Sequence, residues 1–88
     1  MAKYESEIKT RIGALADYLH GEILNGSISA SYEDGTDYTV GSMRVIFNVY
    51  ERYSYLGGNR VSLAVTLTDA GDGVVHLCAI TAGGSQAM

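Results

Sequence analysis

The stretch from Met43 to Asp69 constrains the fold of this chain more than any other segment. Its first half is rich in β-branched and aromatic residues, which favour a pleated, half-buried strand. Its second half alternates large apolar residues (Val61, Leu63, Val65 and Leu67) with small or polar ones (Ser62, Ala64, Thr66 and Thr68), which is the pattern of a strand with one buried face. The glycine pair Gly57-Gly58 separates the two halves. The stretch therefore predicts a β-hairpin on which the rest of the chain packs.

The positions of the apolar residues predict the register of this hairpin. In both halves they fall at odd numbers, from Met43 to Val49 and from Val61 to Leu67. Residues paired across an antiparallel ladder share a face, so a loop of odd length centred on Gly58 is needed to bring the two rows together. We expect a glycine at positive φ to form a bulge there. The expected pairs are Val49–Leu67, Tyr53–Leu63 and Tyr55–Val61.

Glu51 fits this register badly. It would lie opposite Val65 on the apolar face, where an unpaired carboxylate is unfavourable. Either Glu51 lies beyond the edge of the core, or a bulge shifts the register between Val49 and Tyr53.

One amphipathic helix is predicted before the hairpin, over Arg11–Leu24. Its apolar residues form a single stripe at helical spacing, namely Ile12, Leu15, Ala16, Leu19 and Ile23. Thr10 is the expected N-cap, and Asn25-Gly26 is expected to end the helix with a left-handed residue. We expect the stripe to pack on the odd-numbered face of the hairpin. His20 is interpreted as an ordinary surface histidine.

Four further segments are candidates for strands. Residues 3–9 alternate as an edge strand does, although they could also begin the helix; the strand is favoured. Ser27–Glu33 predicts a strand, Asp34-Gly35 a turn, and Thr36–Val40 a short returning strand. Whether that strand runs on through a bulge at Gly41 or ends in a separate turn stays open. After a turn over residues 69–73, Val74–Ala82 is apolar on both faces and predicts a central or doubly covered strand.

The composition limits the possible functions. Eighty-eight residues form one domain, residues 1–88, for which dimerisation is a common source of added stability. A net charge of −4 argues against nucleic-acid binding. We find no apolar run near the ~18 residues of a membrane span, and no signal peptide at the N-terminus. The single cysteine, Cys78, excludes an internal disulfide and favours the cytoplasm.

Together these elements predict an α+β fold. It comprises an antiparallel sheet of four to five strands, with the one N-terminal amphipathic helix packed on one face.

The candidate binding residues lie on the even-numbered face of the hairpin, beside Thr66 and Thr68. They are Arg44, Asn48, Tyr50 and Arg52. Two guanidiniums and a phenol can hold an anion or stack on a base. The same mixture of arginine and tyrosine is typical of a protein interface. A face exposed to solvent, or covered by a C-terminal element, is the third interpretation.

No group of residues predicts catalysis or a metal site. His76 and Cys78 share a face of one strand, but side chains two residues apart are typically ~7 Å from each other, too far for a nucleophile–base pair. The acidic loops at 33–37 and 69–73 lack the spacing of a calcium loop and fit ordinary turns. The sequence therefore predicts no enzyme, no cofactor and no metal.

Three strings resemble those of a small uncharacterised family of Gram-positive bacterial proteins, a domain of unknown function. They are YERYSYLGGNRVSL (50–63), DYLHGEILNGSISAS (17–31) and AITAGGSQAM (79–88). Other members continue past this C-terminus with an apolar segment and a helix, so the chain resembles a C-terminally shortened member. The resemblance implies no activity, ligand or catalytic residue.

The sequence thus predicts a small cytoplasmic, non-enzymatic domain that acts through a homodimer or another protein partner, without nucleic acid or membrane. The alternative is a small-ligand or anion-binding domain. Its site would be a pocket between helix and sheet, or the sheet face that carries the arginines and Tyr50.

Overall fold

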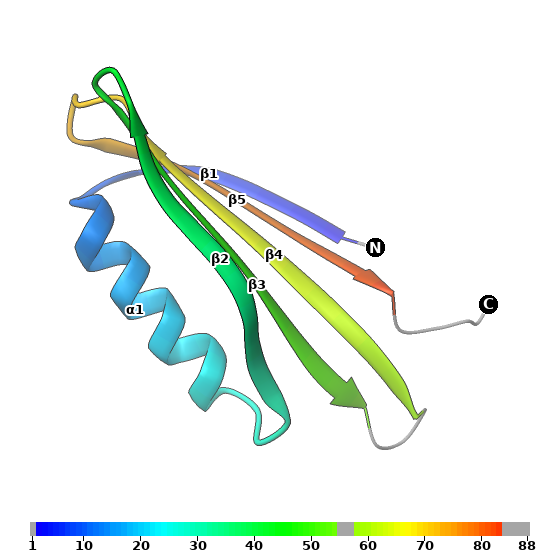
Figure 1. The fold of residues 1–88 in the computed structure, drawn as a ribbon. Helices are drawn as coiled ribbons and strands as arrows, with labels where there is room; N and C mark the ends of the chain where they lie inside the picture. The colour runs from blue at the N-terminus through cyan, green and yellow to red at the C-terminus, as the bar shows by residue number, and fades with distance from the viewer. Residues whose placement is uncertain (1, 55–57, 84–88) are drawn as a thin grey trace.

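The computed structural model describes residues 2–54 and 58–83. These form one helix and five strands: β1 (Ala2–Lys9), α1 (Ile12–Asn25), β2 (Ala30–Val40), β3 (Met43–Ser54), β4 (Asn59–Asp69) and β5 (Val74–Gly83). The strands make one sheet in the order β1-β5-β4-β3-β2, and every neighbouring pair is antiparallel. Helix α1 lies along one side of this sheet (Figure 1). The predicted α+β fold is confirmed.

The helix has the predicted stripe but different ends. It begins at Ile12 with Arg11 at the N-cap position, where no side chain caps the helix. The N–H of Thr10, the predicted cap, instead donates to the carbonyl of Gly73 over 3.2 Å. At the other end Gly26 has φ −77°, so the expected left-handed residue is absent.

The predicted register of the β3–β4 hairpin is wrong. The observed pairs join odd to even positions, with Val49 opposite Ala64 and Tyr53 opposite Arg60. Ser54 pairs with Asn59, so the loop at 55–58 has an even length. Gly58 has the expected positive φ, at 65°. The pairing predicted for Tyr55 lies outside the described residues.

This register reverses the face of β3 on which the helix packs. The buried core consists of Ile12, Ile46, Tyr50, Val65, Leu67, Val75 and Leu77. Even positions of β3 therefore share the helix side with odd positions of β4 and β5, and Phe47 lies on the opposite side. The shift also explains Glu51, which faces away from the core and pairs with Arg60 at 2.6 Å.

The remaining strands agree with the sequence in part. Residues 2–9 form edge strand β1, as favoured, and β5 lies between β1 and β4. The turn predicted at Asp34-Gly35 is wrong, because β2 runs through it with a bulge between Tyr32 and Asp34. The open choice at Gly41 is settled as a turn with φ +60° between β2 and β3.

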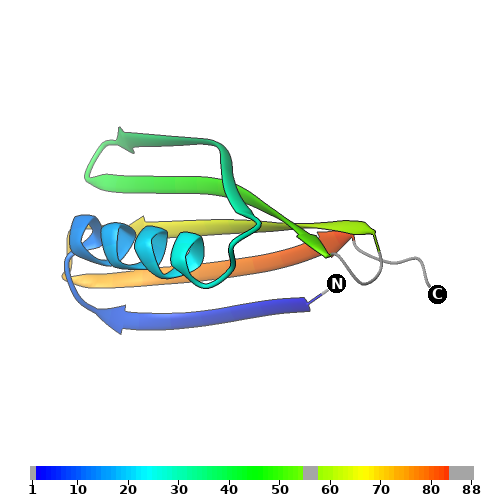
Figure 2. The same cartoon turned by 90° about the horizontal axis from the view of Figure 1, so that it is seen from below.

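The helix runs along the strands, over the middle of the sheet (Figure 2). Within the described residues, no helix is both long and apolar enough to cross a membrane.

Candidate functional site

A groove of about 540 Å³ lies between α1 and the half of the sheet formed by β2 and β3. The helix wall carries the small residues Gly13 and Ala16, which leave space above the strands. Arg44 and Asn48 line the opposite wall. The predicted pocket between helix and sheet and the predicted arginine-bearing sheet face are therefore one place.

The structure brings together three of the four predicted binding residues. Arg44 and Asn48 line the groove, and Tyr50 lies beside it with 3% of its surface exposed. Arg52 lies further along β3, at a separate pocket of about 320 Å³ near the end of the helix. Thr66 and Thr68 pair with odd positions of β3 and so lie on the other face, contrary to the prediction.

Arg44 is held by Asp37 of β2. Its Nε and Nη2 donate to the two carboxylate oxygens of Asp37 over 3.0 and 2.7 Å. These hydrogen bonds raise the pKa of the guanidinium and lower the pKa of the carboxyl group. The guanidinium of Arg44 is already paired with a carboxylate, and Arg52 lies at a different pocket. The two arginines therefore do not form the predicted anion-binding site together.

Three aromatic rings meet at one end of the groove. His20 Nδ1 lies 2.8 Å from the hydroxyl of Tyr50. The ring of Tyr32 meets His20 and Tyr50 edge-on, at centroid distances of 5.5 and 5.8 Å. Burial raises the pKa of Tyr50, so its hydroxyl keeps its proton.

His20 is thus a half-buried partner of the core, and its interpretation as a surface histidine is wrong. The available signal was its position four residues after Ala16, on the flank of the apolar stripe.

Gly35 lets the side chains of Asn48 and Tyr32 pack closely against the backbone of β2 at the floor of the groove. A Cβ there would lie 2.6 Å from the carbonyl oxygen of Phe47 and 2.8 Å from the hydroxyl of Tyr32, and it would overlap Oδ1 of Asn48. Only a residue without a side chain fits this position. The sequence suggested a turn here, because glycine after aspartate is typical of turns as well.

The opposite side of the sheet carries apolar residues along β2, β3 and β5 and the polar residues Ser62, Thr66 and Thr68 along β4; we call it the uncovered face. Its apolar residues are Tyr38, Val40, Met43, Val45, Phe47, Val49, Ala64, Cys78 and Ile80. The registers connect them across strands, since Ala64 pairs with both Val49 and Ile80. Phe47 and Met43 are 37% and 41% exposed. Among the described residues, no helix or strand packs on this face (Figure 1).

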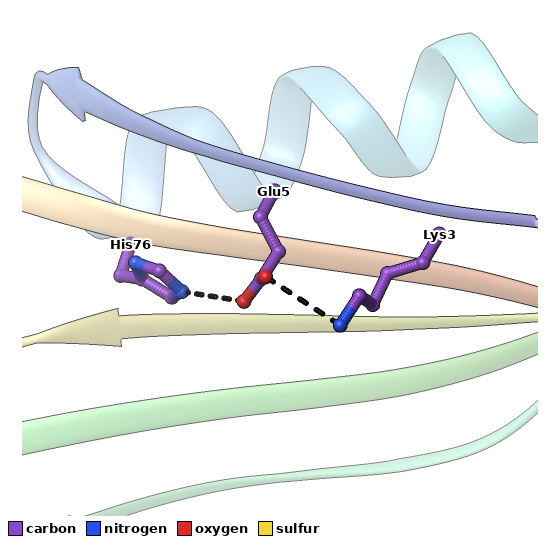
Figure 3. Close-up of polar contacts among 3 residues, drawn as sticks. All are labelled: Lys3, Glu5 and His76. Carbon is purple, nitrogen blue, oxygen red and sulfur yellow. Dashed lines mark hydrogen bonds and ion pairs between the residues drawn. The ribbon is translucent and has the colours of Figure 1, made fainter.

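A charged group borders the uncovered face at β1. Glu5 Oε2 lies 3.2 Å from His76 Nε2, and its other oxygen lies 3.7 Å from Nζ of Lys3 (Figure 3). The hydrogen bond with His76, followed by the charge of Lys3, lowers the pKa of Glu5. Because Glu5 pairs with Cys78, this group marks where the apolar surface ends.

Residues 1–88 match the model of a family of unknown function, DUF6054. The chain belongs to this family. No curated protein matches the sequence. Membership in DUF6054 therefore assigns no activity, and a function has to be argued from the geometry.

The aspartates of the turn at 69–73 accept hydrogen bonds from the backbone of that turn, whereas residues 33–37 belong to strand β2 of this DUF6054 chain. Asp69 accepts a hydrogen bond from the N–H of Gly71 at 2.8 Å, and Asp72 accepts one from Val74 at 3.1 Å. Within residues 2–54 and 58–83, His, Cys, Asp and Glu side chains form no group of three that could hold a metal ion.

Proposed function

We propose that this DUF6054 protein is a non-enzymatic, cytoplasmic module that pairs with a second copy of itself through the uncovered face. One observation carries the proposal: Met43 and Phe47 stand in a continuous apolar row and are 41% and 37% exposed. Contiguous apolar patches on small proteins mark interaction sites.

The size of the face suits a stable pair. The four strands β2 to β5, about 4.8 Å apart and about ten residues long at ~3.3 Å per residue, make a face of about 630 Å². A standard interface takes about 600–1,000 Å² from each partner. Two sheets stacked face to face at about 10 Å would form a shared core, as in a β-sandwich.

The edges of the sheet favour this geometry over pairing edge to edge. The β1 edge carries Lys3, Glu5, Glu7 and Lys9, and the β2 edge carries a bulge next to Tyr32. Charges and bulges are the devices with which proteins block edge pairing. Along β3 the uncovered face is apolar from Met43 to Val49, and its charge at Glu51 is paired with Arg60. It is therefore the surface left for association.

A second copy is the partner that this face fits best. The charges at the margins of this face, Glu51 with Arg60 and Glu5 with Lys3, are paired within the chain. A two-fold axis can therefore place the apolar part against itself without a charge complement. Pairing would also bury additional apolar surface, which stabilises an 88-residue chain whose own core is small. The single cysteine supports the cytoplasmic part of the proposal, since the chain makes no internal disulfide.

The proposal moves the interface away from Tyr50 and Arg52, where the sequence placed it. Tyr50 is buried under the helix, so its replacement by alanine would damage the fold rather than report on association. The Gram-positive source and the shortened C-terminus implied by the resemblance stay predictions.

Sedimentation equilibrium across the micromolar range tests the proposal. The wild-type chain should reach twice its mass of 9.4 kDa. Phe47→Lys should stay at the single mass with an unchanged circular dichroism spectrum, because a lysine cannot be buried at the pair's centre. Tyr18→Lys, at a side chain 63% exposed on the helix, is the matched control and should still pair.

Two results would contradict the proposal. A wild-type chain that stays at 9.4 kDa throughout would remove self-association altogether. A Phe47→Lys variant that pairs as the wild type does would place the contact on another surface.

A further inference from the structure

The groove between α1 and β2–β3 lies on the opposite side of the sheet from the uncovered face. We propose that this groove binds a flat, uncharged, nitrogen-containing aromatic ring of the size of a nucleobase. Ligand binding in the groove does not depend on self-association, because no apolar residue of the uncovered face lines the groove.

The charges of the groove exclude an anionic ligand. Its lining holds Asp17, Asp37 and Arg44 besides His20. The guanidinium of Arg44 donates from Nε and Nη2 to the carboxylate of Asp37, which balances its charge. The carboxylate of Asp17 is left without a compensating charge among the described groove residues. A phosphate or carboxylate entering here would meet repulsion, whereas a neutral ring would not.

The shape of the groove suits a flat ring. One wall is the helix at Gly13 and Ala16, and the other is the sheet at Gly35 and Asn48. The rings of His20 and Tyr32 form the end, 5.5 Å apart and nearly perpendicular. A volume of about 540 Å³ falls within the range of small-molecule sites, about 300–1,000 Å³. Aromatic side chains at such a position stack well against planar ligands.

Neutral hydrogen-bonding groups converge on the same space. The hydroxyl of Tyr32 and the amide of Asn48 both approach Gly35. The contact between Nδ1 of His20 and Tyr50 leaves Nε2 for another partner. Asn48 also contacts Tyr50, yet an amide keeps a second N–H and an acceptor. Amides and hydroxyls of this kind match the mixed donors and acceptors on the edge of a heteroaromatic ring.

An NMR titration of the ¹⁵N-labelled chain tests the proposal, with adenosine as the neutral probe and adenosine 5′-monophosphate as its anionic match. Adenosine should cause saturable shifts at His20, Tyr32, Gly35 and Asn48. The monophosphate should bind about tenfold more weakly, because its charge lies near Asp17.

A pair of leucine variants locates the site. Ala16→Leu extends a side chain into the groove from the helix and should abolish the adenosine shifts. Ala14→Leu makes the same change at an exposed helix position outside this groove and should leave them intact. Both replace one good helix former with another, so both variants should stay folded.

Three outcomes would overturn the proposal: no saturable shift with adenosine, equal affinity for the monophosphate, or binding that persists in Ala16→Leu. Shifts of Phe47 and its neighbours with protein concentration report self-association instead. The titration therefore distinguishes a failure of ligand binding in the groove from a failure of self-association.

Discussion

Both faces of this sheet carry apolar residues, and the helix covers only one of them. On the helix side, Leu67 and Val75 are 2% and 0% exposed. On the other side, Phe47 and Met43 stand 37% and 41% exposed, although they belong to the same strand as buried Ile46. The covered face accounts for the fold. The apolar residues of the uncovered face are not needed to pack the helix on the sheet. For this reason we propose that they contact a partner.

The largest expected difference between the faces is in folding stability. Leu67→Ala should lower the free energy of unfolding by about 3 kcal/mol, because it leaves a cavity beneath the helix. Phe47→Thr should lower it by about 1 kcal/mol or less, since its side chain is already partly in water. Urea unfolding at protein concentrations where the chain is a monomer measures both. Equal losses would mean that the uncovered face is part of the folding core.

Gly35 offers a second contrast, within β2. Gly35→Ala should cost about 2 kcal/mol, because its Cβ would strike the Phe47 carbonyl and the Tyr32 hydroxyl. Thr36→Ala, one residue later and on the other face, should cost about 0.5 kcal/mol. Thermal unfolding of the two variants compares them directly. A Gly35→Ala variant as stable as the wild type would show that the groove floor is loosely packed.

The buried hydroxyl of Tyr50 predicts a smaller effect. Tyr50→Phe removes the contact with His20 and should cost about 1 kcal/mol near neutral pH. Tyr38→Phe, at a side chain 48% exposed, should cost nothing measurable. Chemical unfolding of both variants decides the matter. Equal stabilities would show that the His20–Tyr50 contact contributes nothing.

Tyr50 also makes the free energy of unfolding depend on pH in alkaline solution. Burial raises its pKa, so the folded chain holds the proton longer than the unfolded chain does. The stabilisation is complete below the unfolded pKa of about 10 and is lost as the pH rises through the folded value. Tyr50→Phe should lose less stability than the wild type over this range. Unfolding curves above pH 9 measure the difference.

The smallest effect is expected at the charged border. The pKa of Glu5 is lowered by His76 and Lys3, so its contribution is present above the unfolded pKa and is lost as the pH falls through the folded one. Glu5→Gln should flatten the decline of stability in acid. His76→Phe should flatten it more than Lys3→Met, because the hydrogen bond with His76 is the main cause. Unchanged acid slopes in all three variants would contradict this ranking.

Much of the fold could be predicted because the relevant patterns are local. The helical stripe from Ile12 to Ile23 and the alternation from Val61 to Leu67 each identify an element by period alone. The register could not be predicted, because β3 is apolar on both faces. Its odd row at Met43–Val49 matched the row of β4, whereas Ile46 and Tyr50 are the residues that pack beneath the helix.

The groove was only partly predictable for a different reason. Arg44, Asn48 and Tyr50 lie on one strand, so their shared face follows from the period of a strand. His20 and Asp37 reach the same place from the helix and from β2, across contacts that no local pattern reports. His20 lies 30 residues before Tyr50 in the chain, and Asp37 reaches Arg44 from the neighbouring strand.

The single thiol of the chain gives the most direct test of the central claim, that the uncovered face pairs with itself. Cys78 lies half-buried on that face, opposite Thr66. The measurement is the rate constant for alkylation of Cys78 at increasing protein concentration. It should fall as the wild-type chain pairs and stay constant in Phe47→Lys. A wild-type rate constant that does not change with concentration, while the mass of the chain doubles, would place the contact elsewhere and contradict the account.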